Sequence, residues 1–389
     1  FLGGRHMPWW LLGISMVACT FSCDTPNLVT GMVRQDGVAK NWAWWAFLST
    51  GMVTVFIYAK LWRRSEVMTD LEYYELRYSG KCAAFLRGFR ALYLGILFNC
   101  LIMGSVTLAA IKIGQVMLGL DPLTTVIGAS IFVAIYACLG GLKGVIWADF
   151  FQYSIAMFGA VYAAYVAIQQ PAIQEIGGLA GLVGPDSPIK DKLSIFPDFA
   201  DPKQWMPLLF IPLAVQWWAA WYPGAEPGGG GYVAQRMLAA KDEKNAIGAT
   251  LLFNFMHYAI RPWPWIVVAL ASLVVFQMDT PEDQEAARAA LASETMTAKV
   301  ELLAVSPDQV SEADQKEIAR LTFQSQGLTT LREAYPDLDA QYLKHDIAYP
   351  VMISKLGPGW IGLVIASLIA AYMSTIGTHL NWGSSSVCL

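Results

Sequence analysis

Three residues near the end of the chain have the spacing of a small site built from oxygen ligands. Ala371, Ser374 and Thr375 stand at positions i, i+3 and i+4 of an apolar run, so on a helix they share one face. Two hydroxyls and a nearby carbonyl suit a hard monovalent cation, which needs oxygen ligands. On membrane helices, serine and threonine also bond their own backbone or pack against a neighbouring helix. The pattern becomes specific only beside a second source of oxygens.

The polar interruption of the first apolar run, residues 15–27, is such a source. Asp24 and Pro26 stand where a spanning helix would be at mid-depth. A charge is costly at that depth, and a proline removes a backbone donor. Irregular backbone is tolerated there only when it is buried in protein or lines a cavity. A broken first helix would therefore supply the remaining carbonyls of such a cation site.

The composition shows which elements must position these residues. The chain has 389 residues, of which 56% are hydrophobic and only 14% charged. A soluble domain has nearer a quarter of its residues charged, so the sequence predicts an all-α integral membrane protein. Apolar runs of roughly 20 residues or more are long enough to span a bilayer. We expect eight spans, at residues 8–33, 41–62, 88–118, 123–141, 144–169, 206–235, 246–277 and 349–385.

The loops predict the orientation and the division of the chain. Lysine and arginine gather in loops that fall on one side if the spans alternate, so this side is cytoplasmic. The long polar segment falls on the other side, with helices expected to start at Thr280 and Ser306. Three parts follow: core helices one to seven, an extracytoplasmic helical insertion and core helix eight. Their predicted limits are 1–277, 278–346 and 347–389.

The sixth run is also interrupted. Residues 223–231 combine two prolines with five glycines, and no helix continues through such a segment. Two broken spans at corresponding positions of two halves point to a transporter built from inverted repeats. The alternative is an ordinary kinked helix or a short re-entrant loop.

Several short segments, in order along nearly the whole chain, resemble the sodium:solute symporter family. The matching segments are residues 3–5, 8–10, 140–149, 235–241, 348–350 and 370–381. The resemblance implies a LeuT-type fold, an inverted-repeat helix bundle with broken core helices one and six. By this template the chain is a fragment that holds core helices one to eight, without the preceding helix and core helices nine and ten.

The resemblance also implies a sodium site between core helices one and eight. Carried over by position, the sodium ligands are three backbone carbonyls and two hydroxyls. The carbonyls belong to Ala18, Phe21 and Ala371, and the hydroxyls to Ser374 and Thr375. This agrees with the oxygen chemistry read from the residues themselves.

The family's solute lies beside the sodium ion, and this implies a second group of candidates. The solute-binding candidates are Asp24, Thr25, Asn27, Trp45, Trp221, Glu226, His257 and Arg261. For Arg261 we expect structural pairing with Asp24 or Glu226, with a carboxylate on the solute as the alternative. For His257, contact with the solute and a satisfied buried histidine are equal alternatives. The interruption at residues 223–231 departs from the sugar transporters, which argues against a plain hexose.

The function predicted from these features is sodium-coupled import of a small polar organic solute by alternating access. A sugar, sugar acid, amino acid or organic acid would fit, with Na⁺ as the co-transported ion and the plasma (cytoplasmic/inner) membrane as the location. The alternative is a transporter-like sensory domain of a signalling protein. We expect no enzymatic activity, since the sequence has neither a phosphate-binding loop nor a paired His-x-x-x-His. We expect no nucleic-acid partner, and the sequence does not define the oligomeric state.

Overall fold

A computed structural model of the protein describes residues 2–215, 231–357 and 359–388. Throughout these ranges the secondary structure is helical, and the only strand-like feature is an isolated bridge between Met7 and Ala240. Five helical segments of the described chain are long and apolar enough to cross a membrane. They are Val38–Ser65, Gly80–Leu118, Gly141–Ile168, Glu243–Val275 and Trp360–Ser386. These agree with five of the eight predicted spans to within several residues at most ends.

The first predicted span is broken within residues 15–27, as expected. Helix α1 (Trp9–Thr20) ends where Phe21 leaves the helical region, and α2 (Asp24–Asp36) begins after Cys23. Asp24 and Pro26 therefore lie in the first turn of α2. The first backbone N–H groups of a helix have no partner within it, so a proline is tolerated there. Each half is too short to cross a membrane alone.

The second and third spans are continuous helical rods with π turns inside them. The second contains η1 (Val38–Asn41), α3 (Trp42–Trp45), α4 (Leu48–Val53), η2 (Thr54–Tyr58) and α5 (Ala59–Ser65). After the short α6 (Glu72–Arg77), the third contains α7 (Gly80–Leu92), η3 (Tyr93–Phe98) and α8 (Asn99–Leu118). The fourth and fifth spans are the two arms of α9 (Pro122–Ile168), which bends at Gly141. With φ 51° and ψ −177°, this position requires a glycine, which confirms the predicted division.

Next come α10 (Pro171–Glu175), α11 (Gly178–Val183), η4 (Lys190–Lys192), α12 (Pro202–Trp205) and η5 (Met206–Val215). The predicted break of the sixth span lies at residues 223–231, outside the described residues except for Gly231. Helix α13 (Gly231–Leu238) follows it. The seventh span comprises α14 (Glu243–Asn254), η6 (Phe255–Ile260) and α15 (Pro262–Val275).

The eighth span begins later than the sequence predicted. Residues 348–354 form a separate short helix, α20 (Ala348–Ser354), and the spanning helix is α21 (Trp360–Cys388). Gly359 has a φ of 88°, a left-handed conformation that prevents one helix from running through both segments. The apolar pattern alone does not reveal this turn, because Tyr349 and its neighbours are apolar and buried like the residues of a spanning helix.

The polar insertion contains α16 (Pro281–Leu291), α17 (Glu294–Val305), η7 (Pro307–Gln309), α18 (Glu312–Ser325) and α19 (Thr329–Ala334), followed by η8 (His345–Ile347). Thr280 caps α16 as predicted, by accepting a hydrogen bond from the Asp283 N–H at 3.1 Å. The predicted start at Ser306 is wrong, because residues 307–309 form one 3₁₀ turn and Ser311 caps the helix instead. Hydrogen bonds from Lys299 and Ser311 hold the pKa of Asp314, in this first turn, below its usual range.

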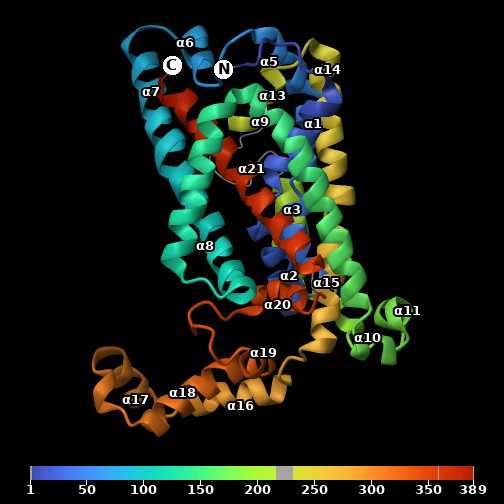
Figure 1. The fold of residues 1–389 in the computed structure, drawn as a ribbon, viewed down its shortest axis with the longest axis vertical. Helices are drawn as coiled ribbons and strands as arrows, with labels where there is room; N and C mark the ends of the chain where they lie inside the picture. Colours follow the sequence, from blue (N-terminus) through green and yellow to red (C-terminus); the bar gives the residue numbers. More distant parts are fainter. Residues whose placement is uncertain (1, 216–230, 358, 389) are drawn as a thin grey trace.

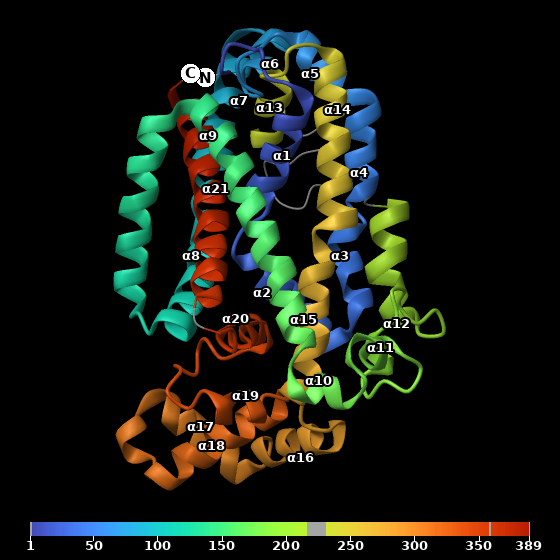
Figure 2. The ribbon, with the colours of Figure 1, turned by 45° about the vertical axis from the view of Figure 1, so that its right-hand side comes forward.

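The helices run between two opposite ends of the molecule. The basic segments α5, α6 and α7 lie at the same end as both termini, and α16–α19 lie beyond the other end (Figure 1). The short helices α10–α12 are also at the insertion's end (Figure 2). This arrangement agrees with the orientation predicted from the basic loops.

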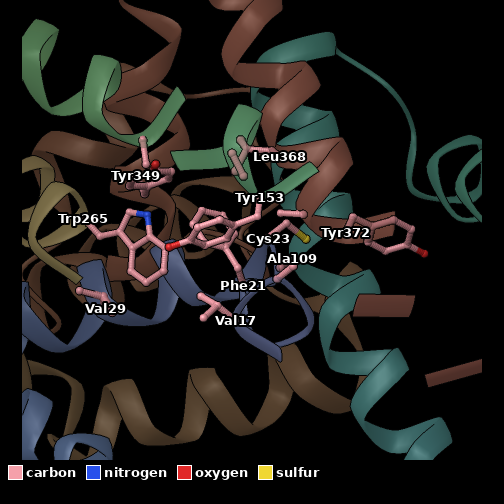
Figure 3. Packing of buried hydrophobic residues seen from close by; sticks show 14 of the residues in the cluster. Val17, Phe21, Cys23, Val29, Ala109, Tyr153, Trp265, Tyr349, Leu368 and Tyr372 are labelled. Atoms are coloured by element: carbon pink, nitrogen blue, oxygen red, sulfur yellow. The ribbon is translucent and has the colours of Figure 1, made fainter. Parts of the chain in front are cut away.

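The core lies where the broken first helix meets α9, α15 and α21. Phe21 packs edge-on against Trp265, with ring centroids 5.0 Å apart, and against Tyr153 at 6.0 Å (Figure 3). Val17 and Trp265 are fully buried in the same cluster. The break in the first helix is therefore held by packing from other helices, which makes it a defined feature of the fold.

Candidate functional site

The break after α1 lies directly against α21. The Thr375 hydroxyl donates a hydrogen bond to the Cys19 carbonyl at 3.1 Å, which joins the two helices. The Ala18 carbonyl accepts from the Phe21 N–H at 3.0 Å, and the chain turns away from the helix at Phe21. Ala371, Ser374 and Thr375 are all buried on the facing side of α21. Residues predicted from two distant runs thus meet at one junction.

A buried polar network continues from this junction; it comprises Ser15, Asp149, Arg236, Ser374 and Thr378. The Asp149 carboxylate accepts one hydrogen bond from Ser374 and one from Ser15, each at 2.6 Å. The Arg236 guanidinium lies 3.3 Å from the same carboxylate, and both side chains are fully buried. Arg236 also donates to Ser15 and Thr378, each at 2.9 Å. The network connects α1, α9, α13 and α21.

Asp149 and Arg236 were not among the predicted site residues. Each stands in a segment that carries the family resemblance, but the sequence pattern assigns neither of them a role. The available signal was a carboxylate inside an apolar run, which membrane helices bury only with a partner. The partner could not be predicted, because Asp149 and Arg236 are 87 residues apart and no local spacing pattern connects them.

A cavity of about 430 Å³ lies beside the junction. Its lining includes Cys19 and Thr375 from the junction, Asp24 and Thr25 from α2, and aromatic side chains. The aromatic and histidine residues of the lining are Trp44, Phe47, Tyr232, His257, Tyr258 and His379. Mostly apolar walls with a few polar groups, at this volume, are typical of small-molecule sites.

The structure brings four of the predicted solute-binding residues to this cavity, namely Asp24, Thr25, His257 and Arg261. It does not bring Asn27 there, since the α2 face that lines the cavity carries residues 24, 25, 28, 29 and 32. That face follows the helical period, and residue 27 falls off it. Trp44 lines the cavity where Trp45 was predicted, because consecutive helical residues point about 100° apart. Trp221 and Glu226 lie outside the described residues.

The predicted ion pair between Arg261 and Asp24 does not form. No carboxylate of the described chain lies within 4.0 Å of the Arg261 guanidinium, which donates instead to Thr20 Oγ1 at 2.9 Å and the Val17 carbonyl at 3.4 Å. A π turn, Phe255–Ile260, sets its position: the Arg261 N–H bonds the Met256 carbonyl, five residues back. Such a turn accommodates Pro262, which has no N–H of its own.

His257 lies in the same group of contacts. Its Nδ1 is 3.0 Å from Thr20 Oγ1, and its Nε2 is 3.4 Å from Arg261 Nη2. Trp44 packs edge-on against its ring at 5.5 Å. His257 therefore borders the cavity and has the hydrogen bonds of a satisfied buried histidine, and its contact with the solute stays a prediction.

A broken first helix that meets hydroxyls of a later helix, beside a small-molecule cavity, is an arrangement of solute transporters. Comparison of the sequence with family models gives the same class: the model of the sodium:solute symporter family matches residues 1–301. The chain belongs to the sodium:solute symporter family, a multi-pass membrane family of transporters rather than enzymes. This confirms the resemblance seen in the sequence.

Individual relatives are more distant. The chain is 24% identical over 388 residues to the sodium/glucose cotransporter of Vibrio parahaemolyticus, covering 98% of this chain and 60% of the relative. It is 26% identical over 409 residues to sodium/myo-inositol cotransporter 2 of Oryctolagus cuniculus, covering 99% and 50%. The chain thus spans about half to three-fifths of the length of these relatives.

A solved structure resembles the whole chain. It is the substrate-bound outward-open state of a Na⁺-coupled sialic acid symporter, described as having a novel Na⁺ site. The match has a TM-score of 0.66 and covers 99% of this chain and 67% of the other, at 19% identity. At this identity the similarity establishes the fold, which confirms the predicted LeuT-type helix bundle.

Proposed function

We propose that the protein is a sodium-coupled symporter that imports a small polar organic solute by alternating access across the plasma (cytoplasmic/inner) membrane. The observation that carries this proposal is the junction at which Thr375 of α21 bonds the Cys19 carbonyl at the end of α1. Thr375 and Cys19 also line the cavity, so an ion at the junction would be next to a solute. The sodium/glucose and sodium/myo-inositol relatives support the same coupling.

Sodium is the transported cation in this proposal, and its ligands are neutral oxygens. The Ser374 hydroxyl donates a hydrogen bond to Asp149, and the Thr375 hydroxyl donates one to the Cys19 carbonyl. The lone pairs of both hydroxyl oxygens therefore remain available for a cation. The carbonyls of Ala18, Phe21 and Ala371 would complete the ligand set. Within the described ranges no group of three or more His, Cys, Asp or Glu residues could hold a metal, which fits a monovalent ion better than a transition metal.

The three-part organisation has matching roles in this mechanism. Residues 1–277 and 347–389 carry the junction and the described lining of the cavity, and residues 278–346 form the extracytoplasmic insertion. Sodium entering from outside would tie α1 to α21 and complete the solute site. Each charge moved inward through the membrane potential yields about 2.3 kcal/mol per 100 mV to drive the transition.

Replacing external sodium with choline is expected to abolish solute uptake, because the nitrogen of choline carries four carbon groups and cannot take oxygen ligands as a bare cation does. The measurement is uptake of radiolabelled candidate solutes into proteoliposomes that contain the full-length protein. Vesicles without protein, and vesicles with an imposed potential but no sodium, are the controls. Uptake that continues unchanged in choline would contradict sodium coupling.

A further inference from the structure

The solute cavity contains two ionisable groups of opposite sign that do not pair with each other. Arg261 and Asp24 both line it, but their charged groups are more than 4.0 Å apart. Arg261 is 1% exposed, and its Nε–H is buried without a hydrogen-bond partner in the described chain. One carboxylate oxygen of Asp24 is likewise buried without a partner. Each group therefore has unused hydrogen-bonding capacity.

The partners that Arg261 does have are all neutral. The Thr20 hydroxyl donates a hydrogen bond to the Val17 carbonyl at 2.8 Å. It therefore acts as an acceptor towards Arg261 and His257. His257 must then donate through Nδ1–H, and its Nε2 lone pair accepts from Arg261. This arrangement requires a neutral His257. Thr20 and His257 orient the guanidinium without cancelling its charge.

Two aromatic rings flank the guanidinium, and they do not replace an anion. Its central carbon lies 5.3 Å from the Trp265 ring and 5.9 Å from the Phe21 ring. Such contacts attract a cation only weakly compared with a full counter-charge. An arginine buried in a membrane without a counter-charge is far more costly, so such residues pair or mark a ligand pathway. Among the described residues no acid compensates Arg261, whereas a ligand in the cavity could.

We infer that the transported solute has a carboxylate that binds Arg261 and a hydroxyl or ammonium group that donates to Asp24. The inference rests on the proposed function, and it specifies the solute as a hydroxy- or amino-carboxylic acid such as a sugar acid or an amino acid. A carboxylate is the planar anion that matches the guanidinium fork. Asp24 is suited to the second group, because its unpartnered carboxyl oxygen can accept a hydrogen bond. With a neutral hexose as the solute, no acid of the described chain would compensate the charge of Arg261.

Matched pairs of compounds test this on the full-length protein, purified and assayed for thermal stabilisation in sodium and in choline buffer. The pairs are D-glucuronate with D-glucose, L-lactate with propane-1,2-diol, and L-proline with L-prolinol. We expect at least one acid to stabilise the protein in sodium, with its neutral or amino-alcohol counterpart binding at least about tenfold more weakly, as for loss of a charged hydrogen-bond partner. The effective pair shows whether Asp24 receives a hydroxyl or an ammonium group.

Variants assign the preference to its residue. Arg261→Gln is expected to remove the preference for the acid, and Arg261→Lys to keep part of it. Arg34→Gln is the matched control: Arg34 is equally buried and bonded to the Ser272 and Phe276 carbonyls, but it does not line the cavity. This control is expected to keep the preference.

The outcomes separate this inference from the proposed function. Equal or tighter binding of the neutral compounds in sodium, or no binding of any acid, would overturn the inference and leave sodium coupling standing. A preference for the acid that persists in Arg261→Gln would also overturn it. Binding of an acid that is the same in choline would support recognition by Arg261 and contradict the symport proposal.

Discussion

Asp149→Asn is expected to lower the free energy of unfolding by about 3–5 kcal/mol, the usual effect of removing one partner from a buried ion pair. Ser374 donates to Oδ1 of Asp149 and Ser15 to Oδ2, so asparagine keeps one of these two acceptors and loses the other together with the charge. Arg236 is then left fully buried with only neutral partners. Thermal unfolding of the purified protein in detergent, followed by tryptophan fluorescence, measures the change.

The control for this prediction is Glu312→Gln, which breaks an exposed pair with Lys316 on the extracytoplasmic insertion. It should change stability by less than about 1 kcal/mol. The double variant Asp149→Asn with Arg236→Gln should recover part of the loss, because no unpaired charge remains. Equal effects of Asp149→Asn and Glu312→Gln would show that the buried pair is not important for stability.

Ser374→Ala is expected to raise the sodium concentration for half-maximal uptake by about tenfold or more, a change typical for the loss of a group that supports a metal site. The half-saturating solute concentration, measured at saturating sodium, should change much less. The reason is position: Ser374 is at the α1–α21 junction and is not part of the cavity lining described above. Initial rates of uptake over a matrix of sodium and solute concentrations separate the two effects.

Two variants on α21 sharpen this test. Ser367→Ala is a matched control, since Ser367 is a buried serine of the same helix whose hydroxyl bonds the Val364 carbonyl of its own helix. It should leave the sodium requirement unchanged. Thr375→Ser keeps the hydroxyl and should also have little effect. If Ser374→Ala and Ser367→Ala behave alike, the proposed sodium ligands are wrong.

Most of the membrane-spanning architecture could be predicted, because it depends on local properties. A spanning helix needs a long apolar run, and such runs are visible in the sequence. Local interactions also placed the cap at Thr280 and the bend near Gly141. The predictions that failed, such as the helix start at Ser306 and the single helix from residue 349, concern segments with ambiguous local signals. In the structure, the left-handed Gly359 separates α20 from α21, and Ser311 rather than Ser306 caps α18.

The sequence by itself determined the class of the protein, the interruption of its first helix and the hydroxyl face of Ser374 and Thr375. Each of these follows from composition or from the helical period. Only the tertiary structure decided which polar groups meet. It paired Arg236 with Asp149 rather than Arg261 with Asp24, and it turned Trp44 rather than Trp45 to the cavity. The physical reason is that a buried charge pairs with a group that the packing of distant helices brings near. The spacing of residues along the chain does not predict which group that is.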